Sequence, residues 1–396
     1  MFDEGGRTFF SQFVSLHGGH PFLPPIPQYT YIMKNIICAL AAGLLLTSCA
    51  GAKKEKTETA EAITPAQALT ERLDSTSKSG KFFFGHHDDT AYGHTWKYEK
   101  GRSDVKDVTG DYPGLMNWDL GMIELDSARN LDGVPFAFMA DEIVAQNARG
   151  GINAISWHLR NPLSRGDSWD VSASPLKEID GNQALSDTLD LWISRAADFI
   201  LSLKDADGKR IPVIFRPWHE NTGTWFWWGA GNSTPEQYID VWKRTRRIFD
   251  EKGVDNVVWA YSPDRVPSPE LYFATYPGDE YVDILGSDIY HFGGVEGTQN
   301  YRDMVSGLLP YIADEASKRG KLVAFTETGL EGVVIDDWYS EVLLPLVSDI
   351  PVAYVCVWRN ANQDEKPEHY YVPYSGHPAE ADFKKFHDDP KTIFVK

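Results

Sequence analysis

The chain has 396 residues, of which 42% are hydrophobic and 24% charged, so it is long enough for one large domain or two ordinary ones with a sizeable core. Its formal net charge of −19 argues against nucleic acid and other phosphate-rich ligands, because these need a basic surface, and it is compatible with a neutral polymer. Aromatic residues make up 13% of the chain and include 13 tryptophans, which favours rings that stack on a ligand in addition to rings in the core.

The first element in chain order is a short apolar segment near the N-terminus. Residues 33–49 have a basic start at Lys34, an apolar run over 36–46 and small residues before Cys49, which is the layout of a secretory signal peptide. The apolar run is too short to cross a membrane as a helix. The stretch 46–49, Leu-Thr-Ser-Cys, resembles the bacterial lipoprotein box, in which the cysteine becomes the lipidated first residue. The alternative is a hydrophobic helix that belongs to the folded domain.

The segments on either side of this signal are predicted to lie outside the fold. Residues 1–32 carry no comparable pattern, so we expect Met33 to be the true start and residues 1–32 to be a non-native extension. Residues 50–64 are rich in Lys, Glu, Thr and Ala and are predicted to form a flexible tether. Ala50 and Gly51 give no retention signal for the inner membrane. We therefore expect a secreted protein that is lipid-anchored through Cys49 to the bacterial outer membrane and has no other membrane contact.

Residues 65–396 are predicted to form one (β/α)8 barrel domain. Short apolar runs alternate there with longer helical patterns, which indicates βαβ units and a parallel sheet. An open doubly wound sheet is the competing fold, but no glycine-rich phosphate loop follows the first strand. Eight strands in one domain instead favour a closed barrel. The predicted strands are residues 81–85, 114–119, 152–158, 212–218, 256–261, 283–289, 322–327 and 352–358.

One helix start is clear in the sequence. Thr234 offers a hydroxyl for an N-cap, Pro235 suits the first helical position, and Gln237 completes a capping box. The spacing predicts a helix from there toward Gly253.

Polar and aromatic side chains gather at the ends of the predicted strands. In a (β/α)8 barrel the carboxyl ends of the strands and the loops that follow them form the active site. Seven of the eight predicted strands end in this way, so we expect a site at the barrel mouth. The residues concerned are 85–89 (Gly-His-His-Asp-Asp), 117–119 (Asn-Trp-Asp), 156–158 (Ser-Trp-His), 216–220 (Arg-Pro-Trp-His-Glu), 287–290 (Ser-Asp-Ile-Tyr), 326–328 (Thr-Glu-Thr) and 358–360 (Trp-Arg-Asn).

Two glutamates are the best candidates for catalysis. Glu220 and Glu327 each follow a strongly apolar strand, where a carboxylate is costly without partners. Two carboxyl groups that flank a bond are what cleavage of a glycosidic linkage requires. The aromatic run that follows Glu220 could raise its pKa and keep it protonated as the general acid. Glu327 lies near Trp358 and Arg359, and hydrogen bonds and a cation would hold it ionised as the nucleophile. A structural ion pair or a helix cap is the alternative for either residue.

The aromatic and histidine residues also have two interpretations. Residues 225–228 (Trp-Phe-Trp-Trp) are consecutive and cannot all face one core, so we expect at least one of them to contact a sugar ring. His86, His87 and His94, with Asp88 and Asp89, could in principle bind zinc, but their spacing matches no zinc motif. We favour hydrogen bonding to sugar hydroxyls for this group. The cysteines provide neither a disulfide framework nor a metal cluster, and no metal or other cofactor is expected. They are Cys38 in the signal, Cys49 and the solitary Cys356.

These motifs together resemble glycoside hydrolase family 26, whose members are mostly β-mannanases. The resemblance rests on residues 216–220 (Arg-Pro-Trp-His-Glu), 225–229 (Trp-Phe-Trp-Trp-Gly) and 325–329 (Phe-Thr-Glu-Thr-Gly), and it extends from residues 84–89 to Arg359. It implies a (β/α)8 barrel, a retaining double displacement with Glu220 as acid/base, and a covalent glycosyl-enzyme on Glu327. It also implies that sugar is bound by His158, Trp169, His219, Trp225, Asp288, Tyr290, Trp358 and Arg359.

The resemblance implies a monomer that acts on β-1,4-mannan, galactomannan, glucomannan or their oligosaccharides. The family also contains enzymes for mixed-linkage β-glucan and β-1,3-xylan, and these remain alternatives. A non-catalytic, glycan-binding lipoprotein would share the aromatic residues and the anchor but would need neither glutamate. A metal-dependent hydrolase on the same barrel would lose activity with a chelator.

Overall fold

The structure is a computed structural model that describes residues 63–361 and 368–396. These residues belong to one compact unit, Glu61–Lys396. The predicted signal peptide, Cys49 and residues 1–32 lie outside the described residues. Among the helices of the described part, none combines the length and apolar character needed to cross a membrane.

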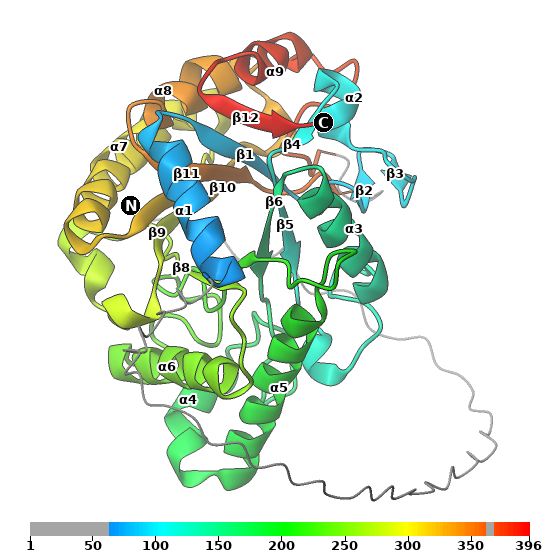
Figure 1. Ribbon diagram of the computed structural model, residues 1–396. Coiled ribbons are helices and arrows are strands. Elements are labelled where there is room, and N and C mark those ends of the chain that lie inside the picture. Colours follow the sequence, from blue (N-terminus) through cyan, green and yellow to red (C-terminus); the bar gives the residue numbers. More distant parts are fainter. Residues whose placement is uncertain (1–62, 362–367) are drawn as a thin grey trace, which may run out of the picture. The chain divides into compact units, whose positions relative to one another are not determined.

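Eight parallel strands form a closed barrel, as the sequence predicts (Figure 1). Neighbours along the barrel are consecutive in the chain, and β1 closes it by pairing with the last barrel strand, Phe83 opposite Tyr354. The barrel strands are β1 (Phe82–His87), β5 (Leu115–Asp119), β6 (Ile152–Ser156), β7 (Val213–Arg216), β8 (Val257–Tyr261), β9 (Ile284–Tyr290), β10 (Leu322–Gly329) and β11 (Val352–Val357). Each corresponds to one of the eight predicted strands.

Helices connect the strands and surround the barrel (Figure 1). They are α1 (Pro65–Lys78), α2 (Asp104–Thr109), α3 (Phe136–Ala148), α4 (Pro175–Glu178), α5 (Gln183–Ser202), α6 (Pro235–Glu251), α7 (Gly294–Arg319), α8 (Leu344–Val347) and α9 (Glu380–His387). Short 3-10 turns lie at Ile123–Leu125, Ile179–Gly181, Pro269–Phe273, Asp279–Tyr281 and Glu331–Val333, and a π-helical turn lies at Trp338–Leu343.

Within the described residues, four short strands lie outside the barrel. β2 (Tyr92–Gly93) and β3 (Trp96–Lys97) form a small antiparallel hairpin in the loop after β1. The C-terminal strand β12 (Thr392–Val395) pairs with β1 in parallel and with β4 (Tyr112–Pro113) in antiparallel fashion. The end of the chain is thereby fastened to the first strand of the barrel.

Helix α6 begins as its sequence predicts. The Thr234 hydroxyl accepts from the Gln237 backbone N–H, and the Gln237 side chain accepts from the Thr234 backbone N–H, with Pro235 at the first turn. This capping box satisfies backbone donors that would otherwise lack partners at the helix start.

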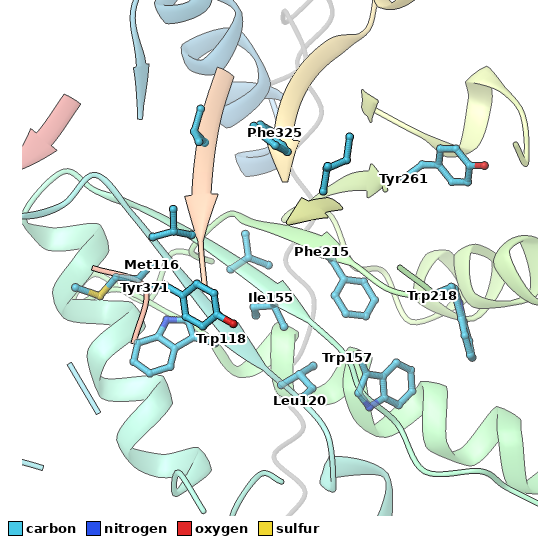
Figure 2. Close-up of a cluster of buried hydrophobic side chains, with 14 of the residues drawn as sticks. Met116, Trp118, Leu120, Ile155, Trp157, Phe215, Trp218, Tyr261, Phe325 and Tyr371 are labelled. Carbon is cyan, nitrogen blue, oxygen red and sulfur yellow. The ribbon is translucent and has the colours of Figure 1, made fainter. Parts of the chain in front are cut away.

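The apolar core has two layers separated by the strands. Alternate residues of a strand point to opposite sides, so in β7 Ile214 joins a cluster inside the barrel while Val213 and Phe215 pack outward against the helices. Leu69 and Leu73 of α1 join the inner cluster, so this helix covers one end of the barrel (Figure 1). Figure 2 shows part of the outer layer, including Trp157. Trp192, Trp242 and Trp259 are also buried in this layer.

Candidate active site

The candidate active site lies at the carboxyl ends of the barrel strands. Arg216 ends β7, and Glu220 lies in the turn that follows it. Tyr290 ends β9, and Glu327 lies near the end of β10. Parallel strands of a barrel all end at the same mouth, and the contacts described below join these residues into one site.

The turn that carries Glu220 has an uncommon backbone. Trp218 and Glu220 have φ angles of 56° and 52°, in the left-handed region that side chains other than glycine rarely adopt. Hydrogen bonds from outside the turn hold this conformation. The Glu220 backbone N–H donates to the carbonyl of Ser262 at 2.8 Å, and the Tyr238 hydroxyl donates to the carbonyl of Trp218 at 2.8 Å. Within this turn, the left-handed φ angles fall on the residue that presents the carboxyl group and on its near neighbour Trp218.

Burial and a neighbouring charge act on Glu220 in the same direction. Burial raises its pKa well above the usual value, and the negative charge of Glu327 raises it further. One interaction opposes this: the Trp225 indole N–H donates to Glu220 Oε2 at 2.6 Å and favours the ionised form. The net direction agrees with the predicted role of Glu220 as a proton donor. The sequence named only an aromatic environment as the cause, whereas the structure adds Glu327.

Glu327 is held by a buried guanidinium and a phenol. Arg216 Nη2 donates to Glu327 Oε2, and the Tyr290 hydroxyl donates to Glu327 Oε1 at 2.6 Å. The other arm of the guanidinium, Nη1, donates to Asp288 Oδ2 at 2.6 Å. The cation expected beside Glu327 is therefore Arg216 at the end of β7. Arg359, which the sequence placed near Glu327, instead forms an ion pair with Asp132.

Asp288 lies behind the site and has no exposed surface. Its carboxylate accepts from Arg216, from the Ser262 hydroxyl at 3.0 Å and from the Thr326 hydroxyl at 2.6 Å. Both oxygens are therefore occupied by protein donors. This arrangement fits an Asp288 that orients Arg216 better than the predicted direct contact with sugar.

A row of rings connects several predicted sugar-binding residues. His158 stacks on Trp169 with ring centroids 5.4 Å apart, and its Nε2 lies 3.0 Å from His219 Nε2. The ring of Trp358 lies 6.1 Å from that of His158 and stacks on His87 at 4.3 Å. The structure thus brings together the last residue of β1 and residues from the loops after β6, β7 and β11.

The aromatic run after Glu220 is mostly core. Phe226, Trp227 and Trp228 are buried, and only Trp225 is partly exposed beside the carboxyl of Glu220. The Trp228 indole instead donates to the carbonyl of His219 at 2.9 Å, which helps to fix the strained turn. Of the four rings, Trp225 is placed to meet a ligand.

Arg359 belongs to a second charged group at the mouth. It forms an ion pair with Asp132 and donates to the Tyr92 hydroxyl at 3.2 Å. The Tyr92 hydroxyl donates in turn to Asp88 Oδ2 at 2.5 Å. Asp132 and Tyr92 lie in loops whose sequences carry no motif, so no pattern could have assigned them to the site.

The residues considered for zinc binding are only partly brought together. His87, Asp88 and Asp132 offer ligand atoms that lie within 4.8 Å of one another. The Arg359 guanidinium already supplies a positive charge at this group through Asp132. His94 stacks on Tyr374 with centroids 3.7 Å apart, and His86 Nδ1 lies 2.7 Å from Asp89 Oδ1. The set proposed from the sequence therefore does not form one ligand shell.

Two carboxyl groups lie at the mouth of a (β/α)8 barrel. One is favoured as the acid, and the other is bound by an arginine and a tyrosine. This arrangement defines a glycoside hydrolase. The model of glycosyl hydrolase family 26 matches residues 59–326, and the chain belongs to this family.

Relatives and solved structures agree with this assignment. The chain is 31% identical over 353 residues to a mannan endo-1,4-beta-mannosidase of Bifidobacterium adolescentis, covering 84% of this chain but only 35% of that protein. It is 30% identical over 267 residues to one from Bacillus subtilis, covering 65% and 70% of the two chains. It resembles the structure of the GH26 beta-mannanase BoMan26A from Bacteroides ovatus, with a TM-score of 0.80, 46% identity and coverage of 84% and 95%.

We expect the pKa of Glu220 to fall when Glu327 is replaced by Gln. The substitution removes the negative charge that raises this pKa and leaves Arg216 without one of its anionic partners, and both changes favour the ionised form of Glu220. NMR titration of 13C-labelled glutamate carboxyls measures the shift, with the Glu220 signal assigned by its loss in Glu220→Gln.

The matched control for this titration is Glu124→Gln. Glu124 is also fully buried, but its contacts are with Trp157 and Arg160. The control should leave the pKa of Glu220 unchanged. An unchanged or higher pKa in Glu327→Gln would show that the two carboxyl groups do not interact as described.

Proposed function

We propose that this protein cleaves β-1,4-mannosidic linkages in mannan, galactomannan or glucomannan with retention of configuration. The observation that carries the proposal is the pairing of Glu220, whose pKa is raised, with Glu327, which is bound by Arg216 and Tyr290. The choice of mannan follows from relatives described as mannan endo-1,4-beta-mannosidases.

In the first step Glu220 donates its proton to the glycosidic oxygen as the bond to the leaving group breaks. Glu327 Oε attacks the anomeric carbon and forms a covalent glycosyl-enzyme. Arg216 and Tyr290 hold the attacking carboxylate in one orientation, which lowers the entropy lost on reaching the transition state. In the second step Glu220, now ionised, removes a proton from water, which attacks the same carbon and releases Glu327.

A side-by-side substrate panel tests the substrate assignment. The purified protein should release reducing ends from glucomannan and galactomannan faster than from mixed-linkage β-glucan or β-1,3-xylan, and a chelator should not change the rates. The glucan arm is included because the chain is also 34% identical over 113 residues to a protein named Endoglucanase H. Faster release from another polymer would reassign the substrate, and binding without release would contradict an enzyme.

Replacing Glu220 by Ala should affect substrates according to their leaving groups. We expect turnover of mannan to fall by about 10²- to 10⁴-fold, because the leaving oxygen then lacks its proton donor. Aryl β-mannosides with very acidic phenols need no such donor, so formation of the glycosyl-enzyme from them should persist and appear as a burst of phenol. Glu327→Ala should abolish turnover of both kinds of substrate. Equal loss on both in Glu220→Ala would contradict its role as acid.

We also propose that Cys49 carries a lipid that anchors the protein to an outer membrane. The support is the signal-like sequence over 33–49, which lies outside the described residues. In a Gram-negative host, Cys49→Ala should move the protein from the outer-membrane fraction to the soluble fraction and abolish labelling with a fatty-acid precursor. Cys356→Ala is the matched control, because Cys356 is buried inside the barrel, and it should keep both properties. Retained labelling in Cys49→Ala would disprove the anchor.

A further inference from the structure

Phe292 has an exposed ring beside the candidate active site. Its side chain is 68% exposed, more than that of any other Phe, Tyr or Trp in the described part of the chain. It lies two residues after Tyr290, the last residue of β9, and the centroids of the two rings are 6.0 Å apart. The Tyr290 hydroxyl donates to Glu327 Oε1. The ring of Tyr290 therefore connects the exposed Phe292 to the carboxyl group of Glu327.

The backbone directs Phe292 and Tyr290 to the same side. Successive side chains of an extended segment point to opposite sides, so residues two apart share one side. His291, which lies between them, points the other way. Its ring stacks on Tyr301 of α7 with centroids 4.9 Å apart, and its Nδ1 accepts from the Trp338 indole N–H at 2.9 Å. Phe292 thus lies on the side on which Tyr290 reaches the active site.

The loop that carries Phe292 is held in place from both ends. The His291 backbone N–H donates to the carbonyl of Gly329 in β10 at 3.0 Å, and His291 Nε2 donates to the carbonyl of Gly294 at 2.8 Å. A Cβ at Gly297 would lie 1.7 Å from the carbonyl oxygen of Phe292, so the start of α7 packs closely against this backbone. A ring on a loop that is already fixed loses little conformational entropy when a ligand covers it.

The strand order places Phe292 where a sugar chain would leave the site. Going around the barrel, β8 and β9 lie between β7, which precedes Glu220, and β10, which carries Glu327. His158 and Trp358 follow β6 and β11, which lie in the other half of the barrel. A chain that rests on those two rings and passes between the glutamates therefore continues over the loops after β8 and β9. Phe292 is in the second of these loops.

We propose that Phe292 is a sugar-binding residue whose exposed ring stacks on a unit of the β-glycan, on the opposite side of the cleaved bond from His158 and Trp358. The faces of a sugar ring carry C–H groups that pack on an aromatic ring, while the hydroxyls at its edge stay in water. The kind of sugar rests on the proposed function, because a phenyl ring offers no donor or acceptor that selects one hydroxyl pattern. The stacking adds affinity and sets how far the chain extends beyond the glutamates.

Affinity for oligosaccharides of different lengths tests this contact. Binding of manno-oligosaccharides of two to six units is measured by calorimetry in a Glu220→Gln background, in which cleavage is slowed. Phe292→Ala should weaken binding of the six-unit oligosaccharide on the order of tenfold, the effect of losing one apolar contact surface of this size. The loss should be smaller for two units, which the rings in the other half of the barrel can hold alone. Equal affinity for six units with and without Phe292→Ala overturns the proposal.

Two further substitutions of Phe292 separate stacking from a general apolar contact. Phe292→Tyr keeps the flat aromatic face, so the affinity for six units should stay within about twofold. Phe292→Leu keeps an apolar side chain but removes the flat face, so it should lose most of the affinity that Phe292→Ala loses. Full affinity in Phe292→Leu overturns stacking, and so does a tenfold loss in Phe292→Tyr.

Val295→Ala is the matched control, and it also tests a second copy of this chain as the occupant. Val295 is 73% exposed in the first turn of α7 and lines one hollow with Val334, which lies beside Gly294 of the same loop. A second copy would cover this apolar surface as a whole, whereas a stacked sugar needs only the ring. Val295→Ala should therefore leave sugar binding unchanged, and equal weakening by Val295→Ala and Phe292→Ala contradicts stacking. A dimer in sedimentation that both substitutions dissociate assigns the surface to a second copy and overturns the proposal.

The position of cleavage tests the consequence for the reaction. In the active protein, the bond that is cut in an end-labelled six-unit substrate reports how many units lie on each side of the glutamates. Phe292→Ala should shift the cuts so that fewer units extend past Phe292, a change that partial unfolding does not produce. An unchanged pattern overturns the role of Phe292 in placing the chain.

The binding measurements also separate this inference from the proposed function. If the unsubstituted protein cleaves no β-glycan, the proposed function fails. Binding of oligosaccharides from mannan, mixed-linkage β-glucan and β-1,3-xylan still decides whether Phe292 stacks on sugar. If none of them binds, or if the affinity of those that bind does not depend on Phe292, the inference fails too.

Discussion

The fork of Arg216 between two carboxylates is the interaction on which the site depends. One arm of the guanidinium binds Glu327 and the other binds Asp288, and all three side chains are nearly or fully buried. Buried carboxylates so close together would repel one another and take up protons without a cation. A guanidinium suits this position because it stays charged when buried and its planar donors can bind two carboxylates at once. Arg216 therefore supplies a positive charge to both carboxyl groups in a place with little access to water.

The same charge balance explains why Glu220 differs from Glu327. Glu220 lies near the carboxyl groups of Glu327 and Asp288, which raise its pKa, and the guanidinium of Arg216 faces those two groups. A further negative charge without a positive partner is disfavoured there, so the proton stays on Glu220. The two glutamates differ because of what surrounds them: Glu327 contacts Arg216 and Tyr290 of other strands, whereas Glu220 contacts Trp225 in the loop that follows it.

The sequence predicted the barrel and both glutamates because these depend on local pattern. Eight apolar runs of strand length recur along the chain, and the polar residues that follow them must meet at one mouth once the barrel closes. The partners of those residues were harder to predict, since they depend on loops and on side-chain direction. Arg216 was recognised as part of a motif, but its partners on β9 and β10 are fixed only by the register of the closed barrel. Asp132 reaches Arg359 from a loop more than 200 residues earlier, and nothing in its neighbourhood marks it.

Retention requires that one carboxyl group donate a proton in the first step and accept one in the second, and the coupling of Glu220 to Glu327 provides for this. While Glu327 is an anion, its charge and the burial of Glu220 hold the proton on Glu220. In the proposed mechanism Glu327 becomes an ester of the sugar, and that charge disappears. The hydrogen bond from Trp225 favours the ionised form of Glu220, and the charge of Glu327 no longer opposes it. The pKa of Glu220 therefore falls, and the group is suited to act as a base. Hydrolysis of the ester restores the charge on Glu327 and with it the affinity of Glu220 for a proton. In the proposed mechanism the covalent state of Glu327 thus decides whether Glu220 acts as the acid or as the base.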